Sequence, residues 1–174
     1  MAYEILYFND VKEVIQKNNL EQMIDDTCRW IEEELPGTRH SDVTLKCILE
    51  DCGWRENPES LRIINGRRYR FKGYLKKAAV EANLGYYEFL WEGLFRLQVG
   101  YDKGAVEMGI LMLNGRRSDK SPLGNSLDLV VEEIDELYPT ISLPVAVILF
   151  DLEVPVDLDE EKQSEKVSVR EEAA

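Results

Sequence analysis

The chain has 174 residues, of which 44% are hydrophobic and 32% charged, and its net charge is -13. These figures predict one soluble domain with a sizeable core, and no apolar run reaches the roughly 18 residues that a membrane-spanning helix needs. The acidity argues against a general nucleic-acid binder, because such proteins neutralise phosphates with Lys and Arg.

The first third of the chain is predicted to be mainly helical. Its N-terminal residues lack the layout of a secretory signal, so we expect a cytoplasmic protein. Residues 3 to 8 form a short apolar strand, and Asn9 or Asp10 can cap the helix that follows. Helical spacing of apolar residues continues to Ile31, and a second amphipathic helix is expected over residues 42 to 53. Its inward-facing residues are predicted to be Val43, Leu45, Ile48 and Leu49.

The middle of the chain changes to the pattern of β-structure. Residues 61 to 64 and 69 to 74 flank an Asn65-Gly66 turn and predict a hairpin, because Asn-Gly readily adopts positive φ. A second turn at Lys76-Lys77 leads to a strand over residues 78 to 84. The hairpin therefore places several basic residues beside a short apolar strand.

Positive charge is concentrated in this middle segment. Residues 55 to 77 hold eight bases and two acids, whereas residues 151 to 174 hold nine acids and three bases. One interpretation is a patch that faces DNA phosphates, and the other is a solvated edge strand protected from aggregation by its charges. Both interpretations stay open from the sequence. The DNA-binding candidates are Arg67, Arg68, Arg70, Lys76 and Lys77.

Helices and strands alternate in the second half. The pattern predicts a helix over residues 86 to 101, a buried strand over 105 to 113, a helix over 127 to 137 and a strand over 143 to 152. The expected fold class is α/β, bordering on α+β, with a central mixed sheet flanked by helices. The aromatic residues of the first of these helices fit a core stripe or, as the alternative, a base-stacking surface. They are Tyr86, Tyr87, Trp91, Phe95 and Tyr101.

Residues 1 to 154 are expected to form a single domain. Its mostly helical N-terminal part covers residues 1 to 54, and its core sheet and helices cover 61 to 152. Residues 155 to 174 are acidic and lack aromatic side chains, so they cannot bury enough apolar surface to offset the entropy of ordering. This tail is predicted to be disordered.

Segments in series over residues 69 to 153 resemble the BglII and BstYI type of restriction endonuclease, within the PD-(D/E)xK nuclease superfamily. Ala79 to Tyr87 look like the family's strand of the form V-E-V-Q-F and the aromatic residue that opens its next helix. Residues 104 to 113 resemble the hydrophobic strand that follows, and residues 143 to 150 the closing strand with its leading proline. The resemblance implies a restriction-endonuclease-like domain that forms a homodimer on double-stranded DNA and uses Mg²⁺ when active.

The resemblance also implies a catalytic site, and one of its ligands is altered. In the family, an aspartate nine positions before the strand glutamate binds Mg²⁺ with it, since a hard cation prefers oxygen ligands. The glutamate corresponds to Glu81, but the aspartate position holds Lys72, and Asn83 stands where the family has glutamine. An ammonium at this position weakens metal affinity. We therefore expect Lys72 to pair with Glu81 in place of the ion.

Three functions follow, and the first is favoured. The protein is a catalytically impaired nuclease-like protein that keeps a role in DNA binding or assembly, or an active Mg²⁺-dependent site-specific endonuclease whose relocated ligand is Glu92 or Glu88 beside Glu81. The third is an acidic protein-interaction module without nucleic-acid binding. Glu107, inside an apolar run, is expected to join the site or to pair with a base such as Arg96.

Overall fold

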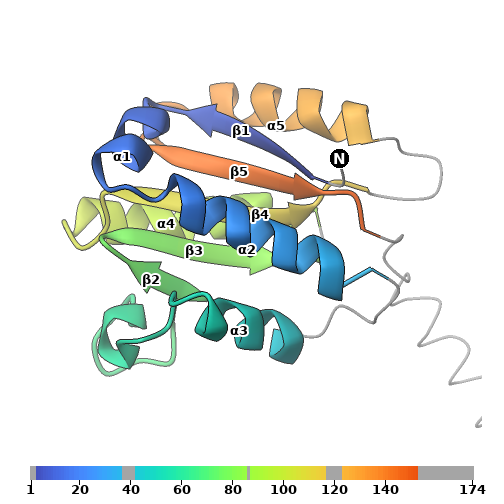
Figure 1. Ribbon diagram of the computed structural model, residues 1–174. Coiled ribbons are helices and arrows are strands. Elements are labelled where there is room, and N and C mark those ends of the chain that lie inside the picture. The colour runs from blue at the N-terminus through green and yellow to red at the C-terminus, as the bar shows by residue number, and fades with distance from the viewer. Residues whose placement is uncertain (1–2, 37–41, 86, 117–122, 153–174) are drawn as a thin grey trace, which may run out of the picture.

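The computed structural model describes residues 3 to 36, 42 to 85, 87 to 116 and 123 to 152, with the side chains of 123 to 125 excepted. Its centre is a five-stranded sheet (Figure 1) in the order β1-β5-β4-β3-β2. In chain order the elements are β1 (Tyr3–Phe8), α1 (Val11–Lys17), α2 (Glu21–Glu34), α3 (Asp42–Asp51), the 3₁₀ turn η1 (Pro58–Leu61), β2 (Gly73–Leu75), β3 (Ala78–Asn83), α4 (Phe89–Asp102), β4 (Met108–Asn114), α5 (Leu123–Leu137) and β5 (Val145–Phe150).

The sheet is mixed, as the sequence predicts. Strands β3, β4 and β5 run parallel, while β1 is antiparallel to β5 and β2 is antiparallel to β3. Every residue of β4 and β5 is buried, which is the environment that their continuous apolar runs predict. The short strand β2 forms one edge of the sheet.

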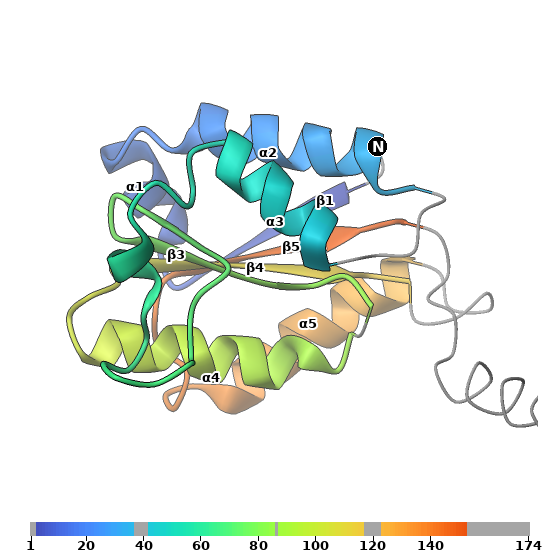
Figure 2. The same cartoon turned by 90° about the horizontal axis from the view of Figure 1, so that it is seen from below.

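Helices cover both faces of the sheet (Figure 2): α1, α2 and α3 lie on one side, and α4 and α5 on the other. Each layer closes over its own apolar cluster. Along β3, Val80 and Ala82 belong to the cluster beneath α1 to α3, whereas Ala79 belongs to the cluster beneath α4. Because side chains alternate along a strand, Glu81 shares the α4 side of the sheet with Ala79.

The N-terminal helical region differs from the prediction in three details. It divides into α1 and α2, with Asn19 at a φ of 53° between them. Asp10 precedes α1 with a φ of 62° but makes no side-chain capping bond. The Asn9 side chain instead donates a hydrogen bond to the Leu143 carbonyl oxygen, 3.1 Å away. In α3, Val43 is 71% exposed, so its predicted inward orientation was wrong.

The predicted hairpin over residues 61 to 74 is only partly formed. A single bridge joins Arg62 and Arg70, and the Phe71 N–H donates to the Leu61 carbonyl at 2.7 Å. The turn η1 extends to Leu61, so little chain remains for a strand on that side. The second predicted turn is present, since Lys76 and Lys77 have φ values of 48° and 60° between the antiparallel strands β2 and β3.

The second half follows the prediction closely, apart from its aromatic residues. Trp91 and Phe95 on α4 are 57% and 64% exposed, so their placement in the core was wrong, while Tyr87 is buried. No helix in the described parts of the chain is long and apolar enough to cross a membrane. The predicted disordered tail and Tyr86 lie outside the described residues.

Candidate active site

Lys72 precedes β2, at a bend that directs its side chain away from Glu81. The Lys72 N–H donates to the Val80 carbonyl at 2.9 Å, and Gly73 pairs with Val80, so the backbone of Lys72 lies opposite that of Glu81. Phe71 and Tyr74 both pack in the cluster beneath α4. Residues three apart in a regular strand lie on opposite faces, so the chain must bend between them, and residue 72 is a bend.

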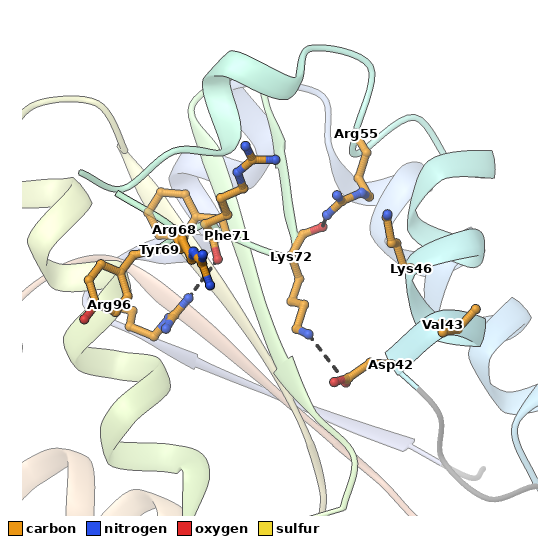
Figure 3. A pocket seen from close by; sticks show the side chains of 10 residues that line it. Asp42, Val43, Lys46, Arg55, Arg68, Tyr69, Phe71, Lys72 and Arg96 are labelled. Atoms are coloured by element: carbon orange, nitrogen blue, oxygen red, sulfur yellow. Dashed lines mark hydrogen bonds and ion pairs between the residues drawn. The ribbon is translucent and has the colours of Figure 1, made fainter. Parts of the chain in front are cut away.

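The Lys72 ammonium points toward α3 (Figure 3). Its Nζ lies 3.4 Å from Asp42 Oδ1, and the Asp42 side chain is 82% exposed. Ion pairs this exposed contribute about 0–1 kcal/mol, because solvent screens them. Lys72 is therefore only weakly held by its acidic neighbour.

Glu81 is held by an arginine of α4. It is 1% exposed, and its Oε1 lies 3.2 Å from Arg96 Nε, although neither of these two buried atoms has a hydrogen-bond partner. The expected pairing of Lys72 with Glu81 was therefore wrong, since Arg96 takes that place. Glu107 pairs with a base, as one of its two expected roles requires, but the base is Lys77 and not Arg96, since Glu107 Oε1 lies 3.9 Å from Lys77 Nζ.

Burial dominates the ionisation of Glu81. It raises the pKa of the carboxyl to about 7, against the opposing pull of the Arg96 and Lys72 charges, and Glu92 raises the pKa further. A carboxylate that lies on the sheet beneath a helix loses most of its hydration, so even a guanidinium at contact distance does not restore an ordinary pKa. Near neutral pH the carboxyl is therefore partly protonated.

This pKa gives a testable pH dependence of stability. The folded-state pKa of about 7 lies above the ordinary glutamate value of 4.5, so the folded protein binds more protons than the unfolded chain between these values. Its free energy of unfolding should therefore fall as pH rises through this window, by on the order of 3 kcal/mol, and level off above it. Urea denaturation of the wild type and of Glu81→Gln at pH 4.5, 6 and 8 measures the difference. If the free energy of unfolding changes equally with pH in both proteins, this pH dependence does not come from Glu81.

Asn83 and Glu92, the other predicted site residues, have different surroundings. Asn83 Oδ1 accepts a hydrogen bond from the Gly85 N–H at 2.9 Å, which stabilises the turn after β3. Glu92 is 64% exposed, and its Oε1 lies 3.8 Å from Arg96 Nη1. Glu81 and Glu92 thus approach the same guanidinium from two elements.

These residues do not fit a divalent metal ion such as Mg²⁺. Such an ion requires several oxygen ligands, and among the described residues no group of three or more His, Cys, Asp and Glu side chains is placed to hold one. Glu81, the one buried carboxylate in the described parts of the chain, already faces the Arg96 charge, and the Asn83 oxygen is engaged by a backbone N–H. Both cations, Arg96 and Lys72, repel a metal ion from this position.

A basic pocket of about 370 Å³ opens beside Lys72. Segment 68 to 72 forms one wall, α3 and Arg55 form another, and Arg96 reaches in from α4 (Figure 3). Six of its lining side chains are basic and one is acidic, in a protein whose net charge is -13. The lining residues are Asp42, Val43, Lys46, Arg55, Arg68, Tyr69, Arg70, Phe71, Lys72 and Arg96.

Two arginines hold the wall of this pocket by its backbone. Arg55 Nη1 donates to the Lys72 carbonyl at 2.6 Å, and Arg96 Nη2 donates to the Arg70 carbonyl at 2.8 Å. Charge-assisted bonds to carbonyl oxygens are stronger than neutral ones. The irregular segment between η1 and β2 is thereby fixed between the two helical layers.

Only some of the predicted DNA-binding residues lie at the pocket. Arg68 and Arg70 line it, whereas Arg67 is not one of the described residues that line it. Lys76 and Lys77 lie in the turn at the other end of β2, where Lys76 Nζ donates to the Asn18 carbonyl at 3.2 Å and Lys77 pairs with Glu107. Sequence reasoning missed Asp42, Lys46 and Arg96 as members of this site, because only the packing of α3 and α4 brings them together.

Comparisons with known proteins identify a related fold. No protein-family model matches the sequence, and no curated protein matches it. The structure is similar to that of the restriction endonuclease BglII complexed with a DNA 16-mer, with a TM-score of 0.58 and 13% identity over 86% of this chain and 78% of that chain. Free BglII gives a TM-score of 0.55 and 16% identity over 86% and 79% of the two chains. Because identity is this low, the likeness concerns the fold, and the chain has the fold of a restriction endonuclease.

Proposed function

We propose that this protein binds double-stranded DNA through its basic pocket and does not cleave it. The observation that carries the proposal is the concentration of six basic side chains around one pocket, beside a buried Glu81 that faces arginine. BglII, which has the same fold, has been crystallised with DNA. In the proposed function the scaffold keeps its DNA-facing site and has lost its catalysis.

The chemistry of the pocket suits a phosphate. Arg68 and Arg70 offer planar forks that can donate two parallel hydrogen bonds to phosphate oxygens. Lys46 and Lys72 add point charges, and their acidic neighbours are weakly attached, since Glu50 is about half exposed and Asp42 is largely exposed. A phosphate can therefore displace these carboxylates without breaking a buried ion pair.

Loss of cleavage follows from the composition of the same site. Hydrolysis of a phosphodiester by metal-dependent enzymes needs an activated water and a cation that stabilises the developing charge. Lys72 and Arg96 can contribute positive charge to a bound phosphate, but neither an ammonium nor a guanidinium activates water as a metal does. We expect bound DNA to remain intact.

A titration of DNA with the protein tests the proposed binding. Fluorescence anisotropy of a labelled 30-base-pair duplex in EDTA is expected to show saturable binding at 50 mM NaCl. The logarithm of the affinity should fall with the logarithm of salt with a slope of about three to five, because each neutralised phosphate contributes about 0.9. Absence of binding at 50 mM salt would refute the proposal and favour an acidic protein-interaction module.

One observation favours a second candidate function, an active Mg²⁺-dependent endonuclease. Glu81 and Glu92 both approach Arg96, so a movement of that side chain on DNA binding would leave two carboxylates facing the same space. Plasmid cutting that requires Mg²⁺ or Mn²⁺ and disappears in Glu92→Gln would establish this function. Unchanged cutting by Glu92→Gln would exclude Glu92 as the relocated ligand.

We further propose that the protein forms a homodimer, as the resemblance to restriction endonucleases implies. Trp91 and Phe95 are one helical turn apart on α4 and are 57% and 64% exposed. Burying aromatic side chains of this size stabilises an association by a few kcal/mol. Sedimentation velocity should show a dimer that dissociates in Trp91→Ser/Phe95→Ser. A monomeric wild type at all concentrations would exclude the homodimer.

A further inference from the structure

Each of the three guanidinium nitrogens of Arg96 lies close to a different partner. Its Nε lies 3.2 Å from Glu81 Oε1, its Nη1 lies 3.8 Å from Glu92 Oε1, and its Nη2 donates to the Arg70 carbonyl at 2.8 Å. The side chain is only 23% exposed. One guanidinium therefore lies between two carboxylates and a backbone oxygen that come from β3, α4 and the pocket wall.

This set of partners is the kind that a hard cation attracts. Two carboxylates and a carbonyl oxygen are suitable ligands for Mg²⁺ or Mn²⁺. Glu81 Oε1 is buried and has no hydrogen-bond donor, so its negative charge is balanced chiefly by electrostatic attraction. An uncompensated charge at such a depth is costly.

We propose that Arg96 is a built-in cation that occupies the position of a divalent metal ion and keeps such an ion out. The inference concerns the same site as the proposed function, on which it rests, and gives the reason for its lost catalysis. Arg96 is a positioning residue here, because it balances Glu81 and fixes the Arg70 backbone.

Arginine suits this role better than lysine. A planar fork reaches partners in three directions at once, whereas an ammonium is a single point on a flexible stem. Arginine, unlike lysine, is also not deprotonated in proteins. A permanent charge of this kind suits a residue that excludes a second cation.

Binding of Mn²⁺ to Arg96→Gln tests the inference. The electron paramagnetic resonance signal of free Mn²⁺ at pH 8 should be unchanged by the wild type and reduced by the variant. The variant should bind the ion at least about tenfold more tightly than the wild type, because a repelling unit charge at contact distance is removed. The gain should disappear in Arg96→Gln/Glu81→Gln and weaken in Arg96→Gln/Glu92→Gln. Arg68→Gln is the matched control for Mn²⁺ binding alone, since it removes one positive charge from the same pocket without exposing these carboxylates, and it should leave the signal of free Mn²⁺ unchanged.

Three results would overturn the inference. They are Mn²⁺ binding by the wild type that Glu81→Gln abolishes, a folded Arg96→Gln that gains no binding, and a gain that persists without Glu81. If Arg96→Gln does not fold, the folding of the double variant Arg96→Gln/Glu81→Gln tests the inference instead. The inference predicts that this double variant folds, because the uncompensated carboxyl has been removed, and failure to fold would refute it.

This test is separate from that of the proposed function. Mn²⁺ binding is measured without nucleic acid, and DNA binding by the wild type is measured in EDTA. If the wild type does not bind DNA but Arg96→Gln gains Mn²⁺ affinity, the proposed DNA-binding function is refuted and the built-in cation is supported. DNA binding together with no gain of Mn²⁺ affinity would support the function and refute the built-in cation.

Discussion

Replacing Arg96 by glutamine is expected to lower the free energy of unfolding by about 2–4 kcal/mol at pH 8. Part of this loss is the charge-assisted bond to the Arg70 carbonyl at 2.8 Å, since bonds of this kind contribute roughly 1.5–3 kcal/mol. The remainder is the lost attraction to Glu81. Protonation limits that second part, because Glu81 has a pKa of about 7 in the wild type and can become neutral when its partner is removed.

Urea denaturation at pH 8 measures this effect, and two variants serve as controls. Glu92→Gln removes the exposed partner of Arg96 and should change the stability by less than about 1 kcal/mol. Arg96→Gln should lower the free energy of unfolding by less in a Glu81→Gln background than in the wild type, because no carboxyl remains to be neutralised. Equal costs in both backgrounds would mean that Arg96 does not stabilise Glu81.

Neutralising Arg68 and Arg70 together is expected to weaken DNA binding at least about tenfold at 100 mM salt. Both side chains line the basic pocket. Removing two phosphate contacts should also reduce the salt slope by about two. Anisotropy titrations of one duplex with the wild type and Arg68→Gln/Arg70→Gln at several salt concentrations give both quantities.

The chain offers matched controls for this prediction. Lys76→Gln/Lys77→Gln removes the same charge from the turn beyond β2, where both lysines already have partners, and should change binding far less. Asp42→Asn removes the acidic neighbour of Lys72 and should strengthen binding. Equal losses in the two double variants would show that net charge, and no particular pocket, governs the interaction.

The sequence predicts the sheet and its helices well because the decisive patterns are local. The uninterrupted apolar run around β4 requires cover on both faces, and Lys76-Lys77 lies between two segments of β-type pattern. The hairpin at residues 61 to 74 was predicted less well. Leu61 belongs to the turn η1 and not to a strand, and the bend at residue 72 interrupts the alternation of side chains between the two faces of the sheet.

The candidate site was predicted only in part, because its decisive contacts join residues far apart in sequence. Lys72, at the position where the resemblance implies an aspartate, is identified by counting back from Glu81 in the sequence. The partner of Glu81 is not, since Arg96 and Glu81 meet only when α4 packs on β3. Trp91 and Phe95 show the same limit, because a helical repeat of aromatic residues does not reveal whether that face is covered.

The most direct test of DNA binding without cleavage is to follow bound and cut DNA in one sample of supercoiled plasmid with saturating protein, in MnCl₂ and in EDTA. We expect the protein to retard the plasmid on a gel to the same extent in both solutions, and the DNA to remain supercoiled after the protein is removed. Nicked or linear plasmid that appears only with manganese, and disappears when Glu81→Gln replaces the wild type, would contradict the proposed loss of catalysis.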